Sequence, residues 1–260
     1  MSAATRARLA RLLRDGPLDL AEANLLICAE ASDGLDMASQ IAHVEGLAQL
    51  AREVGVVPAL RDQGFAGAAE DYDDPRHSLL DAVLARRRGL PIALATLALA
   101  VADRVGTPMA GIGMPGHFVI ADLSGDSPVY IDPFGGWRRI DAAGCAALVE
   151  RTAGLAFRPE FLEPVSGRAI LARTLLNLRR SYLRRRLLGA ALWTVELGLI
   201  VSPDDAELVV GSVTLLTGAG RYAEAEAAAA AFLEARPRDR AAPALEAHLR
   251  TLDDLRRRMN

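Results

Sequence analysis

Lysine is absent from this chain, and cysteine is scarce. All 30 basic residues are arginine, so the chain has no lysine to form a Schiff base or to complete a phosphate-binding P-loop. Its two cysteines, Cys28 and Cys145, are too few for a disulfide framework and match no metal-ligand spacing. These absences exclude two kinds of lysine-dependent site, predict no metal and no cofactor, and fit a reducing compartment.

Long apolar runs are also missing. The longest largely apolar segment, Leu90 to Ala102, is too short to span a bilayer, and the basic N-terminus has no apolar core of signal-peptide length. A formal net charge of −3 provides no general attraction to nucleic acid or to anionic lipid. We therefore expect a cytoplasmic protein that binds neither nucleic acid nor membrane.

Apolar helical sequence, by contrast, is plentiful, since 51% of the residues are hydrophobic. The segment Ile92 to Ala102 is apolar nearly all round, which predicts a helix at the centre of a domain, beginning at Pro91 and closed by Gly106. Amphipathic periodicity in the first sixty residues predicts further helices. Short apolar runs after Gly106 predict antiparallel strands, with a hairpin across Ser124 to Pro128.

An acidic loop, Glu70 to Ser78, precedes the central helix. It lacks the glycine and the distal glutamate of a calcium-binding loop, so we expect a solvated turn. Ser78 stands before an apolar run, and Asp81 follows it by three residues. This pattern is close to a capping box and predicts that Ser78 is the N-cap of a helix.

The last third of the chain contains a repeat. Three pairs of like residues are each separated by 34 positions, the period of tetratricopeptide helix pairs: Ala191 and Ala225, Leu199 and Leu233, and Pro203 and Pro237. The alternative is a plain alanine-rich helical hairpin. Both interpretations predict an all-α domain at the C-terminal end.

A histidine and an aspartate follow the central helix on successive predicted strands. His117 and Asp132 are 132 − 117 = 15 residues apart, which suits adjacent strands of a hairpin. A buried helix, then histidine, then aspartate is similar to the order of Cys, His and Asp in transglutaminase-like proteins. In such sites the cysteine lies at the N-terminus of the helix, where the helix dipole favours the thiolate. Here Leu90 to Ala93 take that place, and none of these side chains is nucleophilic.

The pair His117 and Asp132 therefore has two interpretations. It is a functional dyad that activates water or polarises a ligand, or it is a hydrogen-bonded pair that holds two strands together. Cys28 and Cys145 are the candidates for a relocated nucleophile, although both have the surroundings of small buried hydrophobic residues.

Several separated blocks, in the same order, resemble the SirB-one family of transglutaminase-like proteins, which carry tetratricopeptide-like repeats at the C-terminus. The blocks are LLICAEASDGLD, DYDDPRHSLLDAVLARRRGLPIAL, GHF, IDPF and RAILARTLLNLRRSYL. The resemblance implies an α+β fold: a transglutaminase-like (papain-like) core with N-terminal helices over residues 1–165, then an all-α tetratricopeptide-like domain over residues 166–260. It implies the fold more firmly than any reaction.

The missing nucleophile and the helical tail favour a non-catalytic protein that binds a peptide or protein partner through its cleft and its repeats. The alternative is an amide- or peptide-bond acyl transferase or hydrolase that uses His117 and Asp132 with a relocated cysteine or an activated water. A structural scaffold with a filled cleft is the third hypothesis. The sequence predicts no particular oligomeric state.

Overall fold

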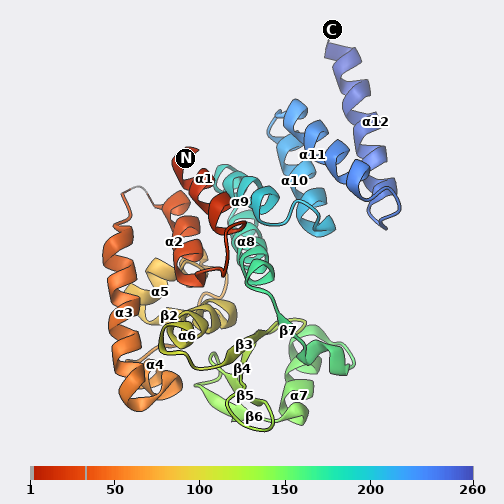
Figure 1. Cartoon of the computed structure of the whole chain (residues 1–260). Coiled ribbons are helices and arrows are strands. Elements are labelled where there is room, and N and C mark those ends of the chain that lie inside the picture. Colours follow the sequence, from red (N-terminus) through yellow and green to blue (C-terminus); the bar gives the residue numbers. More distant parts are fainter. Residues whose placement is uncertain (1–2, 33, 260) are drawn as a thin grey trace. The chain divides into compact units, whose positions relative to one another are not determined.

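The computed structural model describes residues 3–32 and 34–259. The chain forms two compact units, Met1–Thr174 and Leu175–Asn260 (Figure 1). The division falls within helix α8 (Gly167–Arg184), close to the predicted start of the helical tail. Each unit is described by itself.

The first unit combines several helices with a small sheet. Its helices before α8 are α1 (Ala3–Leu12), α2 (Leu20–Ala31), α3 (Met37–Val54), α4 (Val56–Asp62), α5 (Leu80–Arg86), α6 (Pro91–Val105) and α7 (Ala142–Ala153), with 3-10 helices η1 (Pro75–His77) and η2 (Pro159–Leu162). Its strands are β1 (Ala66–Gly67), β2 (Arg88–Gly89), β3 (Met109–Ile112), β4 (Val119–Asp122), β5 (Val129–Asp132), β6 (Arg138–Ile140) and β7 (Pro164–Val165).

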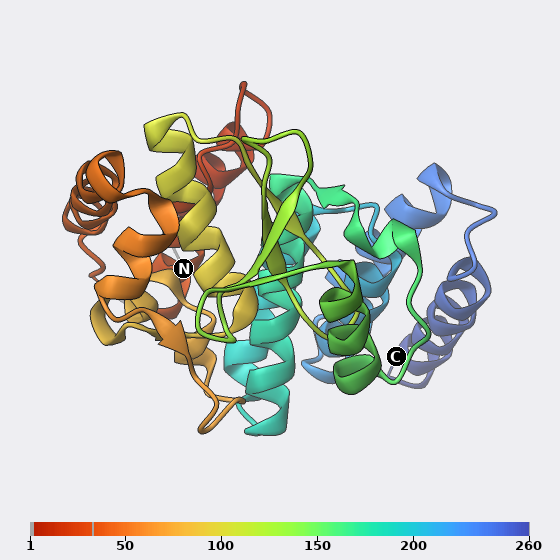
Figure 2. The same ribbon diagram turned by 90° about the horizontal axis from the view of Figure 1, so that it is seen from below.

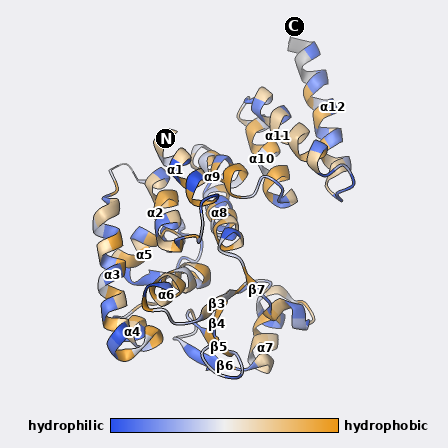
Figure 3. Cartoon of the chain, in the orientation of Figure 1, coloured by the Kyte–Doolittle hydropathy of each residue, from blue (hydrophilic) through white to orange (hydrophobic). Residues whose placement is uncertain are grey.

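Helix α6 is the centre of this unit. Every residue from Pro91 to Ala102 is buried, which confirms the prediction made from its apolar sequence. Pro91 is its first residue, and Gly106 ends it in a left-handed conformation at φ 68°. Helices α2, α3, α4 and α5 pack against α6, as do strands β3 and β4. In Figure 3, α6 is drawn mainly in hydrophobic colours, whereas α3 alternates between hydrophilic and hydrophobic residues.

An antiparallel sheet of five strands, in the order β6-β5-β4-β3-β7, lies between α6 and α7 (Figures 1 and 2). Strands β4 and β5 pair with Ala121 opposite Tyr130, so the predicted hairpin is confirmed. Val119 and Ala121 pack with Cys145 of α7. Since neighbouring strand residues point to opposite faces, Ile120 points to the face that α6 covers. This packing fixes the ends of β4 and β5 near the start of α6.

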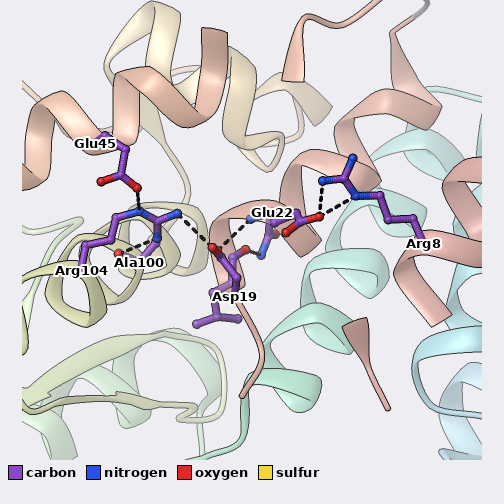
Figure 4. A network of polar contacts seen from close by, with 8 residues as sticks. Arg8, Asp19, Glu22, Glu45, Ala100 and Arg104 are labelled. Atoms are coloured by element: carbon purple, nitrogen blue, oxygen red, sulfur yellow. Dashed lines mark hydrogen bonds and ion pairs between the residues drawn. The ribbon is translucent and has the colours of Figure 1, made fainter. Parts of the chain in front are cut away.

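An arginine near the end of α6 joins three helices (Figure 4). Arg104 donates from Nε to Glu45 of α3 at 2.6 Å and from Nη2 to Asp19 at 3.0 Å. Asp19 is also the N-cap of α2. The Arg104 side chain is only 11% exposed, so its guanidinium is packed as well as paired.

We expect Arg104→Met to lower the free energy of unfolding of the first unit by about 1–2 kcal/mol. Asp19 and Glu45 lose a hydrogen-bond donor in this variant, but both are exposed enough to be hydrated instead. Urea unfolding in a Trp193→Phe background checks this value, because Trp137 is then the only tryptophan in the chain and reports on the first unit.

The matched control is Arg61→Met. Arg61 pairs with Asp62, but both side chains are more than half exposed. We expect a change below about 0.5 kcal/mol, as for other exposed ion pairs. Equal losses in the two variants would show that Arg104 contributes no more than a surface charge.

The acidic loop is only partly the predicted solvated turn. Residues 70–72 are exposed, whereas Asp74, His77 and Ser78 are buried. Asp74 caps η1 and pairs with Arg76. Burial alone would raise the pKa of Asp74, but the hydrogen bonds and charge of Arg76 lower it to about 2. The prediction is therefore wrong for the second half of the loop, which is packed into the unit.

The predicted N-cap at Ser78 is also wrong. The Ser78 N–H donates to the Pro75 carbonyl at 2.9 Å, and its φ of −103° and ψ of −13° are helical rather than extended. An N-cap residue is extended, and Leu79, at φ −90° and ψ 120°, has that role for α5. Because a turn of 3-10 helix precedes it, α5 begins one residue later than the sequence pattern predicts.

The described residues of the second unit form helices joined by short loops, with no strand. Helices α9 (Leu188–Val201), α10 (Ala206–Gly218), α11 (Tyr222–Ala235) and α12 (Ala242–Met259) follow α8, and each packs on the next. They enclose a separate hydrophobic core of Val195, Val209, Val213, Leu216, Ala225, Ala229, Phe232, Leu245 and Leu252.

The 34-residue repeat corresponds to equivalent helices. Helices α9 and α11 are each 14 residues long and begin 222 − 188 = 34 residues apart. Ala191 and Ala225 are both fully buried. Pro203 and Pro237 each follow the end of their helix by two residues. The spacing found in the sequence is therefore also a spacing between helices.

Candidate functional site

His117 and Asp132 lie together at the sheet. His117 is two residues before β4, and Asp132 is the last residue of β5. The His117 Nε2 atom is 2.9 Å from Asp132 Oδ1. The residues are 6% and 4% exposed. The structure thus brings together the two residues that the sequence predicts as a pair.

The turn that carries His117 is held from two sides. Arg173 of α8 donates from Nη2 to the carbonyl oxygens of Met114 and His117, at 2.8 and 2.9 Å. Gly116 has a φ of 72°, and a Cβ added there would lie 2.5 Å from Oγ1 of Thr152 in α7. A glycine is therefore needed both for the backbone conformation and for the close approach of α7.

Asp132 is held in its ionised form. Its Oδ1 accepts from His117 and from the Phe134 N–H at 3.1 Å, and the Gly135 amide also donates to the carboxylate. Burial alone would raise the pKa of Asp132, but the hydrogen bond and charge of His117, together with these amides, lower it. Because a carboxylate can only accept, Nε2 of His117 carries the hydrogen. Whenever the ring is neutral, Nδ1 therefore presents the lone pair.

A pocket of about 440 Å³ opens beside the pair. His117 and Asp132 line it together with Pro91, Tyr72 and Phe134. The ring of Phe134 meets those of His117 and Tyr72 edge to face, with centroids 6.1 Å apart in both cases. The pocket is therefore part polar and part aromatic.

Pro91 is the one residue of the predicted vacancy, Leu90 to Ala93, that lines the pocket. It is the first residue of α6 and, although buried, lines the pocket, whereas Leu90, Ile92 and Ala93 are buried and do not line it. A proline side chain has no atom that can attack a carbonyl. If the predicted nucleophile position lies in this pocket, Pro91 is the residue that takes it.

Neither cysteine supplies the missing thiol. Cys28 is buried in α2, and burial followed by the charge of Asp81 raises its pKa well above the usual value. Cys145 is buried in α7, where burial and then the charges of Asp141 and Asp132 raise its pKa to about 11. Both thiols are neutral at pH 7, and the pocket lining includes neither.

Arg138, Arg151 and Thr152 complete the pocket from β6 and α7, and sequence reasoning missed all three. No local pattern marks them, because the fold alone brings their elements to the start of α6. Arg173 was missed for the same reason. Gly116 had a signal, since it stands beside His117 in the quoted GHF element.

The described residues offer no metal site and no membrane span. Within residues 3–32 and 34–259, no group of three or more His, Cys, Asp or Glu side chains could hold a metal ion. The helices of this part of the chain are too short or too polar to cross a bilayer. His248 bonds Thr217 in the second unit, with Nε2 and Oγ1 2.8 Å apart.

The first unit is thus an α+β structure in which a buried helix begins at a pocket lined also by His117, just before β4, and by Asp132, at the end of the adjacent strand β5. This is the arrangement of the transglutaminase-like class, with proline at the start of the helix. The family model of the transglutaminase-like superfamily matches residues 39–176, just over half of the chain. The chain therefore belongs to the transglutaminase-like superfamily.

Several curated proteins are similar to this chain. A UPF0162 protein of Vibrio cholerae is 35% identical over 147 residues, which cover 56% of this chain and 54% of the relative. A UPF0162 protein of Xylella fastidiosa (strain 9a5c) is 37% identical over 124 residues, 46% of this chain and 44% of the relative. Mouse F-box only protein 21 is 31% identical over 120 residues, 43% of this chain and 19% of the relative.

The chain spans about half the length of the bacterial relatives and a smaller part of the mouse protein. No solved structure matches it at a significant level.

Proposed function

We propose that this chain is a non-catalytic member of its superfamily that binds a peptide segment of a protein partner in the pocket beside His117. The observation that carries the proposal is Pro91 at the start of α6, inside the same pocket as His117 and Asp132. The nucleophile is absent, yet the pocket persists with a volume of about 440 Å³, within the range of ligand sites.

The walls of the pocket suit a peptide. Phe134 and Tyr72 offer aromatic faces to an apolar side chain, and Tyr72 is 46% exposed. The Nδ1 lone pair of His117 accepts a hydrogen bond from a peptide N–H. Asp132 orients the ring through Nε2 and so acts on the ligand through His117.

The second unit supports a protein partner. Its helices repeat at 34 residues, which favours tetratricopeptide-like pairs and, with the quoted sequence blocks, a place in the SirB-one family. Stacked helix pairs present surfaces suited to peptides. Under this proposal the protein acts in the cytoplasm, since its two unpaired cysteines suit a reducing compartment.

The alternative function is hydrolysis of an amide or peptide bond by water. The observation that favours it is the orientation of His117, whose Nε2–H donates to an ionised Asp132 and leaves Nδ1 as a base. Nδ1 would take a proton from water as the water oxygen bonds to the carbonyl carbon. That proton would then pass to the amine as the C–N bond breaks.

One experiment separates binding from hydrolysis. The full chain is equilibrated with a tryptic digest of casein, and retained and free peptides are identified by mass spectrometry. We expect retention of a subset of peptides, recovered chemically unchanged. Tyr72→Ala should reduce that retention at least severalfold, because it removes a wall of the pocket. Leu123→Ala, which changes an exposed side chain outside the pocket, is the matched control.

Newly cleaved or deamidated peptides that disappear in a His117→Ala variant would establish the hydrolytic alternative. Failure to retain any peptide, or equal retention by the Tyr72→Ala variant, would refute binding in this pocket.

A further inference from the structure

We propose that the ligand of this pocket carries a carboxylate group and that Arg138 and Arg151 bind it. The inference rests on the proposed binding function and adds the chemical class of the ligand. Arg138 is the first residue of β6, and Arg151 lies in the last turn of α7. The two arginines come from different elements, yet both line the pocket of His117.

Neither guanidinium is paired with a carboxylate of the described residues. Arg138 donates from Nε to the Gly135 carbonyl at 2.9 Å, and over residues 3–32 and 34–259 neither it nor Arg151 forms an ion pair. The carboxylate that lines the pocket, Asp132, already accepts from His117 and from backbone amides. The pocket therefore has two positive charges and one engaged negative charge.

The start of α6 adds to the positive potential. This helix of 15 residues has no acidic residue in its first turn and no side-chain hydrogen bond at its N-cap, Leu90. Its N-terminal end carries the positive partial charge of the helix dipole and reaches the pocket at Pro91. Three sources of positive potential, from β6, α7 and α6, thus converge on one cavity.

A carboxylate on an organic ligand fits these surroundings better than a small ion. The guanidinium group matches a carboxylate with two parallel hydrogen bonds. The pocket is also much larger than a carboxylate, and Phe134 and Tyr72 form an apolar wall beside the arginines. The C-terminal residue of a peptide supplies both a carboxylate for the arginines and a side chain for the apolar wall. An Asp or Glu side chain within a peptide supplies the same carboxylate group.

Three pools of N-acetylated tetrapeptides test the inference and distinguish the two sources. The first has random sequences without Asp or Glu and with free C-terminal carboxylates, and the second has the same sequences as C-terminal amides. The third consists of amides with one Asp or Glu. Retention by the full chain is measured for the wild type, for the double variant Arg138→Gln with Arg151→Gln, and for Arg139→Gln.

Arg139 is the matched control, because it is exposed on the same strand but does not line the pocket. All three arginines are exposed, so the variants should keep the stability of the wild type in urea. We expect the wild type and Arg139→Gln to retain the first or third pool at least tenfold more than the second. The double variant should lose that preference.

Retention of the first pool alone identifies a chain terminus, and retention of the third pool identifies an acidic side chain. Equal retention of all pools would overturn the carboxylate inference while leaving peptide binding intact. A preference that persists in the double variant would also overturn it. If no pool is retained, the inference fails, and the casein experiment decides the proposed function separately.

Discussion

The first unit of an Asp132→Ala variant is expected to unfold with about 3 kcal/mol less free energy than the wild type at pH 7. The substitution leaves Nε2 of His117 and the amide of Phe134 without their acceptor in a buried site. Unpaired groups of this kind cost more than the hydrogen bonds they formed. Urea unfolding in the Trp193→Phe background, followed through Trp137, measures the loss.

The pH dependence of the unfolding free energy separates the contribution of the Asp132 charge from that of its side-chain shape. Asp132→Asn keeps the size of the side chain and one acceptor oxygen, so its loss at pH 7 should be smaller, about 1–2 kcal/mol. The folded-state pKa of Asp132 is lowered, so its charge contributes fully to stability above the ordinary pKa of about 4. This contribution is lost as the pH falls from about 4 through the lower, folded-state pKa. The difference between wild type and Asp132→Asn should therefore shrink below pH 4. A difference that grows there would show that the carboxylate is not stabilised by folding.

Gly116→Ala should also cost the first unit about 3 kcal/mol. Part of this loss is backbone strain at a φ of 72°. The rest comes from the new Cβ, which would lie 2.5 Å from Oγ1 and 2.9 Å from the backbone carbon of Thr152. Because the backbone of α7 must move to relieve this overlap, the variant should also lose peptide retention.

Gly136→Ala is the matched control for Gly116→Ala. Gly136 has a similar φ of 79°, but a Cβ added there meets no atom within 4 Å. We expect its loss to be about 1 kcal/mol, from backbone strain alone. Equal losses in the two variants would show that the contact between Gly116 and Thr152 does not hold the turn.

The parts of the site that the sequence predicts are those with a local signal. The nearly uninterrupted apolar run of α6 predicts a buried helix, and Pro91 and Gly106 mark its ends. The strand patterns place His117 and Asp132 on a hairpin, where their separation of 15 residues makes contact feasible.

The parts that the sequence did not predict depend on tertiary packing. Tyr72, Arg138 and Arg151 reach the pocket from a loop, a strand and a helix that are separated in the sequence. Their side chains are common on protein surfaces, so nothing local distinguishes them. At Ser78 the local pattern was misleading. It resembles a capping box and predicts an N-cap, but Ser78 is buried at the end of the 3-10 helix η1.

The central claim is that the site retains a transglutaminase-like arrangement in which Pro91 stands in place of the nucleophile. The most direct test is the rate at which iodoacetamide alkylates Pro91→Cys at pH 7, resolved by peptide mapping. The thiol would lie at the positive end of α6 in the pocket of His117, and both features favour the thiolate. Cys28 and Cys145 are internal controls, and Ala93→Cys is a control at a position of the same helix that does not line the pocket.

The introduced thiol should react at least tenfold faster than Cys28, Cys145 or the thiol of Ala93→Cys. Adding His117→Ala to Pro91→Cys should remove most of that advantage. An unreactive thiol at position 91, or one that is alkylated equally fast with and without His117, would contradict the assignment of this pocket as a transglutaminase-like site.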